Sequence, residues 1–435
     1  MLFTSTRDKN LSVPFSKAVR DCIPHDGGVF IPSQIEDLRR WIYYIDENTT
    51  FSSIAGTLTS AFLKDEFSPI ICEKIATTAF PFEPKIKQLD KNLFSMELYN
   101  SYTGCHRDFG VSYLVSYLET TLELNGGNAV FLDYTHGGLG ALLAKLLHGK
   151  KNIRAVLVYK KGTVKGINDE DLFWNGGNIY PVEVEGEESE IKQMISSIFE
   201  NHEFVNEHSL TVANTTNVCR LLAQMFVFPY AFSQLKNKIT DDIYFALDSG
   251  NYGTLIAGLY SWRFALPVSG FLVPTSNALT SDAIGNPVML DSFVNINKRD
   301  KSSPIIPANL ERLESFFEQN ELMMRNFVYL SDISEEKIEN AAKELFIKYH
   351  FFADKETARA YATILAKRDA LDEEEDTVVL VSYNHPSLSA DFCRKTIGEK
   401  PEVPESILAI QKETILNRPL ITTKEELIEI IEKLK

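Results

Sequence analysis

Residues 99–110, Tyr-Asn-Ser-Tyr-Thr-Gly-Cys-His-Arg-Asp-Phe-Gly, gather aromatic, polar and ionisable side chains in one short stretch. Cys105 and His106 are adjacent there, which suggests a thiol nucleophile with an imidazole base. Neighbouring residues on a strand point to opposite faces, and on a helix they lie about 100° apart. We therefore expect no direct pairing of Cys105 with His106.

Two further stretches rich in glycine each stand between an expected strand and an expected helix. Residues 134–141 read Tyr-Thr-His-Gly-Gly-Leu-Gly-Ala, and residues 248–254 read Asp-Ser-Gly-Asn-Tyr-Gly-Thr. Glycines let the backbone approach a ligand, and the N-terminus of a helix offers free N–H groups to an anion. The stretch 248–254 therefore predicts a phosphate nest, whereas 134–141 is equally compatible with a tight connection that binds nothing. Neither stretch ends in the Gly-Lys-Ser/Thr of a P-loop, which disfavours nucleoside triphosphate hydrolysis.

Metal chemistry has little support in the sequence. His106 and His136 have no carboxylates or thiolates at ligand spacing, so we predict no metal site.

The elements that position these turns follow a strand, turn, helix order, which is typical of parallel α/β architecture. Apolar runs predict strands at 128–133, 153–159, 178–184, 242–248, 268–274 and 377–383. Helical spacing predicts helices at 141–148, 189–199, 254–264 and 424–435. Residues 1–90 look mainly helical and are broken by prolines.

We divide the chain into a helical N-terminal region (1–90), a first α/β lobe (91–240) and a second α/β lobe (241–435). The second lobe is expected to include a long loop at 280–310 and helices through 308–370. Ligands of open parallel sheets bind beyond the carboxyl ends of the strands. Arg107, Gly137 and Gly250 should therefore lie in one cleft between the lobes.

Composition limits the class of protein. A chain of 435 residues should form two or three domains, and a net charge of -16 with a pI near 5.1 argues against a nucleic-acid footprint. Residues 221–232, the longest apolar stretch, are too few to span a membrane and predict a buried helix. The five cysteines include no C-x-x-C pair, and the polar start lacks a signal peptide, so we expect a cytoplasmic protein with reduced thiols.

Six stretches, in order along nearly the whole chain, resemble threonine synthase, a pyridoxal-phosphate enzyme family of fold type II. They are Phe-Thr-Ser-Thr-Arg from residue 3, His-Asp-Gly-Gly-Val-Phe-Ile-Pro from 25, and Glu97 to Gly110 against the family's E-L-F-H-G-P-T-x-A-F-K-D-F-G. Val212 to Gln224 is similar to S-A-N-S-I-N-W-x-R-x-x-x-Q, residues 249–253 to S-G-N-F-G, and residues 382–386 to T-A-H-P. The resemblance implies two parallel-sheet α/β lobes of the tryptophan-synthase-β-like kind.

The resemblance also implies roles for individual residues. The loop of Ser249, Gly250, Asn251, Tyr252 and Gly253 would bind the cofactor phosphate, and Tyr383 stands where the family has a threonine beside the pyridine nitrogen. The implied substrate-binding residues are Thr135, His136, Gly137, Asn214, Asn217 and Arg220.

Three departures from the family pattern fall on the reacting centre. Arg107 stands at the position of the lysine that forms the Schiff base, and a guanidinium can neither form that bond nor act as a base at physiological pH. The family's T-S-G-D-T-G turn reads Thr-His-Gly-Gly-Leu-Gly from residue 135, and Tyr383 is much larger than threonine.

We therefore predict a catalytically degenerate or repurposed threonine-synthase-like protein that keeps an anion cradle. Pyridoxal phosphate, implied by the resemblance, would be bound without a covalent bond or be absent, with phosphate or sulfate in its place. Two alternatives stay open: an active threonine synthase that converts O-phosphohomoserine to threonine and phosphate, or another enzyme on this scaffold. A phosphorylated or carboxylated small molecule is the expected ligand, with no nucleic acid and no membrane as partners, and the sequence leaves the identity of any protein partner open.

Overall fold

A computed structural model describes residues 1–168, 172, 177–239, 241–289, 294–318, 320–372 and 375–434. The chain opens with a small antiparallel sheet of order β2-β1-β3, made of β1 (Leu2–Ser5), β2 (Val13–Pro14) and β3 (Phe30–Pro32). The helices of this region are α1 (Phe15–Asp21), α2 (Arg39–Tyr44), α3 (Phe51–Leu63) and α4 (Pro69–Ala79). The helices expected in this region are present, and α1 lies between β2 and β3 of a small sheet that was not predicted from the sequence.

The first large sheet has five parallel strands in the order β10-β6-β7-β9-β18. They are β6 (Ala129–Tyr134), β7 (Ile153–Lys160), β9 (Ile179–Val184), β10 (Leu210–Thr211) and β18 (Leu420–Ile421). One face packs on α8 (Glu188–Phe199), α9 (His202–Glu207) and α19 (Lys424–Glu432). The other face shares the main core with α5 (Arg107–Asn125) and α6 (Gly138–Leu146).

The second large sheet has the order β15-β12-β11-β16-β5-β4, and every pair is parallel except β4 with β5. Its strands are β4 (Lys85–Gln88), β5 (Leu93–Glu97), β11 (Ile243–Ala246), β12 (Val268–Pro274), β15 (Val328–Ser331) and β16 (Thr377–Ser382). One face carries α15 (Glu335–Tyr349) and α16 (Lys355–Ala366). The other face of this sheet packs against the main hydrophobic core. The helices on that side are α10 (Val218–Leu222), η1 (Ala223–Phe226), α11 (Val227–Leu235), α12 (Gly253–Arg263), α13 (Asn309–Phe317) and α14 (Glu321–Phe327).

The predicted fold class, two parallel α/β lobes, is confirmed, but the sheets do not follow the expected residue boundaries. Strand β5 lies within 91–240 and pairs with β16 of the second sheet, whereas β18 near the C-terminus pairs with β9 of the first. Strand β15 interrupts the expected run of helices at 308–370. The expected loop at 280–310 contains the hairpin β13 (Leu279–Ser281) and β14 (Pro287–Met289) and the short helix η3 (Ile296–Lys298). Residues 290–293 of that loop lie outside the described residues.

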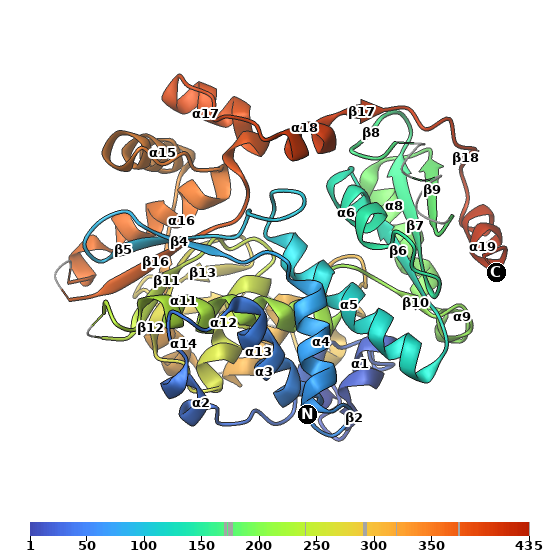
Figure 1. Cartoon of the computed structure of the whole chain (residues 1–435), viewed down its shortest axis with the longest axis horizontal. Coiled ribbons are helices and arrows are strands. Elements are labelled where there is room, and N and C mark those ends of the chain that lie inside the picture. The colour runs from blue at the N-terminus through green and yellow to red at the C-terminus, as the bar shows by residue number, and fades with distance from the viewer. Residues whose placement is uncertain are drawn as a thin grey trace.

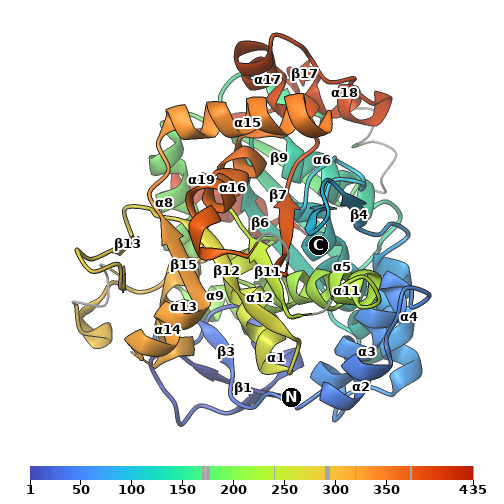
Figure 2. The same ribbon diagram turned by 90° about the vertical axis from the view of Figure 1, so that its left-hand side faces the viewer.

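The end of the chain crosses from one sheet to the other (Figure 1). After η4 (Arg368–Ala370) and β16 come η5 (Pro386–Ser389), α17 (Ala390–Ile397) and α18 (Glu405–Gln411). Strand β17 (Glu413–Thr414) then pairs with β8 (Val164–Lys165), beside the first sheet. Figure 2 shows α17 and α18 together on the same side of the molecule as α15.

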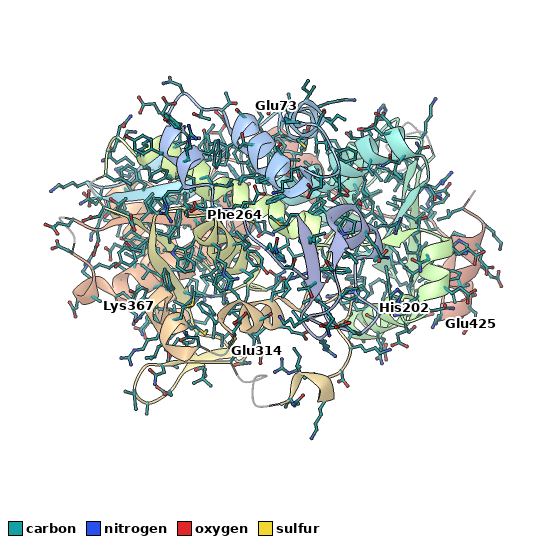
Figure 3. All side chains as sticks on the ribbon, turned by 90° about the horizontal axis from the view of Figure 1, so that it is seen from below. Glu73, His202, Phe264, Glu314, Lys367 and Glu425 are labelled. Atoms are coloured by element: carbon teal, nitrogen blue, oxygen red, sulfur yellow. The ribbon has the colours of Figure 1, made fainter. Side chains whose placement is uncertain are left out.

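The two sheets lie side by side along the long axis of the molecule. Lys367 after α16 and Glu425 of α19 lie toward opposite ends of that axis in Figure 3. None of the helices in the described part of the chain has the length and apolar character needed to span a membrane.

Candidate anion site between the two sheets

Arg107 is the first residue of α5, and its guanidinium points to the start of α6. The turn before α5 is held by Asp108, whose carboxylate accepts from the Thr103 backbone N–H at 2.5 Å and from its hydroxyl at 2.6 Å. Arg107 Nη2 donates to Cys105 Sγ at 3.4 Å. The same Nη2 lies 3.4 Å from the place that a Cβ on Gly138 would take. The expected approach of Arg107 to the turn at 134–141 is confirmed.

Arg220 of α10 lies beside Arg107. Its Cζ is 3.4 Å from the place of a Cβ on Gly110, one turn into α5, and the residue is only 6% exposed. Burial and then the charge of Arg107 lower the pKa of Arg220 to about 10. In the described part of the chain, the Cys105 sulfur is the only hydrogen-bond acceptor that either guanidinium contacts, and both Nε atoms lack one.

Asp133, at the end of β6, and Asp108 are carboxylates that act on Arg220, and Asp133 is a weak counter-charge. Its Oδ2 accepts from the backbone N–H of Ala213 at 2.8 Å. Burial raises the pKa of Asp133 to about 7, against the lowering effects of that hydrogen bond and of Arg220. Near neutral pH this carboxyl is therefore only partly ionised, and the two guanidiniums keep a local excess of positive charge.

The turn before α6 is shaped by Thr135 and Gly137. Thr135 Oγ1 accepts from the backbone N–H groups of Gly137 at 2.9 Å and Gly140 at 3.1 Å. Gly137 has φ 134°, and a Cβ there would lie 2.3 Å from the backbone oxygen of Lys165 in β8. Only glycine fits such a backbone next to a neighbouring strand.

His136, expected to bind substrate, points elsewhere. Its Nε2 lies 3.1 Å from Glu188 Oε2 at the start of α8, and its side chain is 72% exposed. Its ring packs edge-on against Tyr134. Within the described residues its contacts are with Glu188 and Tyr134 and not with Arg107, and the substrate-binding role that the resemblance implies stays a prediction.

The loop at 248–254 uses several of its own backbone N–H groups. The N–H groups of Gly250 and Ser249 donate to the Asp248 carboxylate, and Gly253 donates to Asn251 Oδ1 at 3.0 Å. Tyr252 donates to the Ser249 carbonyl at 2.7 Å. Asp248 also accepts from Arg359 Nη1 at 3.0 Å, although burial still raises its pKa. These contacts remove most of the free amides on which the expected phosphate nest depends.

Tyr383 stands between this loop and the start of α5. Its hydroxyl accepts from the backbone N–H of Asp248 at 3.1 Å, and its carbonyl accepts from the His106 N–H at 2.8 Å. Its ring meets the His106 ring edge-on with centroids 5.0 Å apart. Tyr383 therefore joins the two turns, which confirms that Arg107, Gly137 and Gly250 belong to one region.

Asn214 and Asn217, also expected to bind substrate, make structural contacts. Asn214 donates to the Pro304 carbonyl at 2.8 Å and accepts from the Thr216 N–H at 2.8 Å. Asn217 donates to the Val19 carbonyl at 3.1 Å and caps α10 by accepting from Cys219 N–H at 3.0 Å. Their side chains thus fix the backbone that presents Arg220.

The sequence analysis was wrong to separate Cys105 from His106. Cys105 Sγ lies 3.7 Å from His106 Nδ1. The argument from regular geometry fails because Cys105 sits in an isolated bridge with Asn384 and His106 caps α5, so neither residue is inside a strand or a helix. The role of Asp248 was not predicted, although a carboxylate directly before a Ser-Gly-Asn turn is a visible signal against phosphate binding.

Comparison with known proteins agrees with the geometry. A family described as "Pyridoxal-phosphate dependent enzyme" matches residues 76–382, and "Threonine synthase N terminus" matches residues 2–80. Threonine synthase of Serratia marcescens is 25% identical over 414 residues, covering 94% of this chain and 93% of that protein. That of Buchnera aphidicola subsp. Baizongia pistaciae is 27% identical over 375 residues, covering 84% and 85%.

Solved structures show the same fold. The crystal structure of threonine synthase from Escherichia coli has a TM-score of 0.79 at 21% identity and covers 100% of both chains. The pyridoxal-phosphate-bound threonine synthase from Brucella melitensis has a TM-score of 0.79 at 18% identity, covering 99% of this chain and 98% of that one.

Proposed function

Because this chain belongs to the pyridoxal-phosphate-dependent enzyme family and resembles its threonine synthases, we propose that it keeps their scaffold as a receptor for a small anion. In this proposal it does not carry out the lysine-dependent synthesis of threonine. The ligand is a small molecule with a phosphate or carboxylate group, held by Arg107, Arg220 and the first turn of α6.

One observation supports this proposal above all: Arg107 and Arg220 are neighbouring guanidiniums, and within the described residues neither makes an ion pair with a carboxylate at contact distance, although Asp108 acts on both from farther away. A buried charge costs several kcal/mol unless it is paired. Two like charges together raise that cost, and an anion between them removes it. Guanidinium binds carboxylate and phosphate through two parallel hydrogen bonds, which makes it well suited to this role.

The family's cofactor fits these residues poorly. Arg107 aligns with the Schiff-base lysine and has no amine that could form that bond. Tyr383 fills the space between α5 and the loop at 248–254, and the Asp248 carboxylate takes amides that a phosphate would need. Lys145 of α6 and Lys165 of β8 are engaged elsewhere, since Lys145 Nζ lies over the Tyr102 ring at 4.4 Å and Lys165 Nζ lies 3.6 Å from Glu413.

Calorimetry tests the proposal directly. Inorganic phosphate, succinate and O-phosphohomoserine are titrated separately into the wild type, Arg107→Gln and the control Arg39→Gln, whose side chain is 80% exposed on α2. We expect at least one anion to bind the wild type and Arg39→Gln equally. Arg107→Gln should bind it about tenfold or more weakly, since hydrogen bonds to charged groups contribute about 1.5–3 kcal/mol. Equal binding by Arg107→Gln, or no binding by the wild type, would contradict the proposal.

The two alternatives give different results. A lysine-independent enzyme on this scaffold would bind an anion and also convert it, which product analysis by mass spectrometry after the titration would reveal. An active threonine synthase would release phosphate from O-phosphohomoserine once pyridoxal phosphate is added.

A further inference from the structure

The sulfur of Cys105 lies inside the proposed anion site. It accepts from Arg107 Nη2 at 3.4 Å and lies 3.7 Å from His106 Nδ1. Cys105 also lies close enough to act electrostatically on Arg220, the buried arginine whose Nε has no acceptor in the described part of the chain. The thiol therefore has two cations and one imidazole around it, and a cationic neighbour stabilises the thiolate, which is the reactive form.

His106 presents a neutral ring nitrogen to the thiol at neutral pH. Burial, followed by the charges of Arg220 and Arg107, lowers the pKa of His106 to about 4, while Glu356 acts in the opposite direction. The ring is thus neutral at pH 7 and has one nitrogen free to accept a proton. The backbone N–H of His106 donates to the Tyr383 carbonyl. The β-bridge between Cys105 and Asn384 holds the backbone of the preceding residue.

The other cysteines lack this setting. Burial raises the pKa of Cys22 to about 12 and that of Cys72 and Cys393 to about 11, and it raises that of Cys219 well above the usual value. Cys105 is itself only 4% exposed, but His106, Arg107 and Gly138 beside it are partly exposed, so the site opens to solvent. The four other thiols serve as internal controls.

Three neighbouring residues differ together from the family pattern. Where that pattern has Ala-Phe-Lys, this chain has Cys105, His106 and Arg107. The exchange removes an amine and introduces a thiol, an imidazole and a guanidinium that contact one another. Loss of function by itself gives no reason for the three new groups to meet.

We propose, on the basis of the proposed anion site, that Cys105 is a nucleophile for small carboxylates with an electrophilic carbon next to the carboxylate. Arg107 and Arg220 hold the carboxylate, and the proton of the thiol passes through His106 Nδ1 to solvent water. The sulfur then forms a bond to the carbon while the bond from that carbon to its leaving group breaks. The leaving group departs as an anion with the electron pair, so the step needs no oxidant or reductant.

The test compares two alkylating agents of similar size on the folded full-length chain. Iodoacetate carries a carboxylate, and iodoacetamide is neutral. Peptide mass spectrometry follows the rate of each reaction at Cys105. The rate with iodoacetate is divided by the rate with iodoacetamide. This ratio is then divided by the same ratio measured for 2-mercaptoethanol in the same buffer. We expect this normalised ratio to exceed about ten, because the guanidiniums concentrate the anion at the sulfur. Added phosphate should slow the reaction with iodoacetate.

Variants assign the effect to residues. Arg107→Gln should lower the ratio about tenfold, and His106→Gln should slow both reagents without lowering the ratio. Cys105→Ser should remove the fast-reacting thiol while circular dichroism confirms that the chain still folds.

The outcomes separate this inference from the proposed function. Calorimetry can show phosphate binding while Cys105 reacts with neither reagent, or prefers iodoacetamide as 2-mercaptoethanol does. That result would overturn the proposal that Cys105 is a nucleophile and would leave the proposed anion site standing. If phosphate and carboxylates do not bind, the proposed function fails by calorimetry whatever the thiol does.

Discussion

At the scale of single residues, the central feature is a pair of neighbouring arginines that make no close ion pair within the described residues. A cation in the first turn of a helix also opposes the helix dipole, and Arg107 is the first residue of α5. The ligand-free protein thus bears a cost that an anion would relieve.

Arg107→Gln should therefore stabilise the ligand-free protein and abolish its response to phosphate. We expect a gain of about 1–2 kcal/mol in the free energy of unfolding in a buffer without phosphate. The wild type should gain stability as phosphate is added, whereas the variant should not. Urea unfolding with and without phosphate measures both. A variant less stable than the wild type without phosphate would contradict this reading of Arg107.

Asp133 predicts a dependence of stability on pH. Its pKa is raised to about 7 in the folded state, and the usual value for aspartate is about 3.9. Between these values the folded state binds more protons than the unfolded state. The contribution of Asp133 to the free energy of unfolding is therefore complete below about pH 4. It decreases as the pH rises to 7, by at most about 1.4 kcal/mol per pH unit.

Asp133→Asn should remove that loss. The amide oxygen can still accept from Ala213, so the variant should match the wild type near pH 4 and exceed its stability at pH 8. Urea unfolding at both pH values gives the comparison, and Asp391→Asn, whose parent side chain is 90% exposed, is the control. An equal effect at both pH values would show that the change acts through packing instead.

Sequence reasoning identified Arg107, Arg220 and the glycine-rich turns, because residue types and spacing are visible in the chain. It placed His136 in the site and separated Cys105 from His106, because the direction of a side chain in a turn depends on contacts distant in sequence. Glu188 holds His136, and Asn384 pairs with Cys105.

At the scale of elements, the start of α6 positions the site, and Gly137 makes that start possible. Gly137→Ala would strain φ and push against the Lys165 carbonyl of β8. We expect a loss of about 2–4 kcal/mol in the free energy of unfolding, since strain and overpacking add.

Gly149→Ala is the matched control, because Gly149 also has a positive φ, 74°, with nothing within 4 Å of its Cβ position. Its cost should stay near 1 kcal/mol, the cost of the backbone conformation alone. Thermal or urea unfolding of both variants measures the difference. An equal loss of unfolding free energy in both variants would mean that the close approach of β8 to α6 does not contribute to stability.

Elements with long apolar runs were predicted well, as β12 at 268–274 shows. Short strands such as β10 and β18 carry too few residues for a periodic pattern, and β15 follows directly after α14 without a turn signal. Pairing partners are also invisible in one sequence, which is why residues 93–97 were assigned to the first lobe although β5 pairs with β16 of the second sheet.

At the scale of the whole molecule, the site needs both halves. α6 belongs to the side of the five-stranded sheet, whereas Tyr383 and Asp248 follow strands of the six-stranded sheet. Helix α18 lies across the same region, and Ile407 Cδ1 comes within 2.5 Å of the place that a Cβ on Gly104 would take. The chain keeps the scaffold of its relatives over nearly its full length. We propose that it differs from them in the residues at the reacting centre.

The most direct test of that account is phosphate release from O-phosphohomoserine with added pyridoxal phosphate, measured for the wild type beside Arg107→Lys. We predict no release by the wild type above the rate without protein, because no amine is present at residue 107 to hold the cofactor or move protons, and loss of such a group costs at least about 10²–10⁴-fold in rate. Arg107→Lys should recover activity only in part, since Tyr383 and Asp248 still occupy the space and the amides of the site. Robust turnover by the wild type would contradict the account.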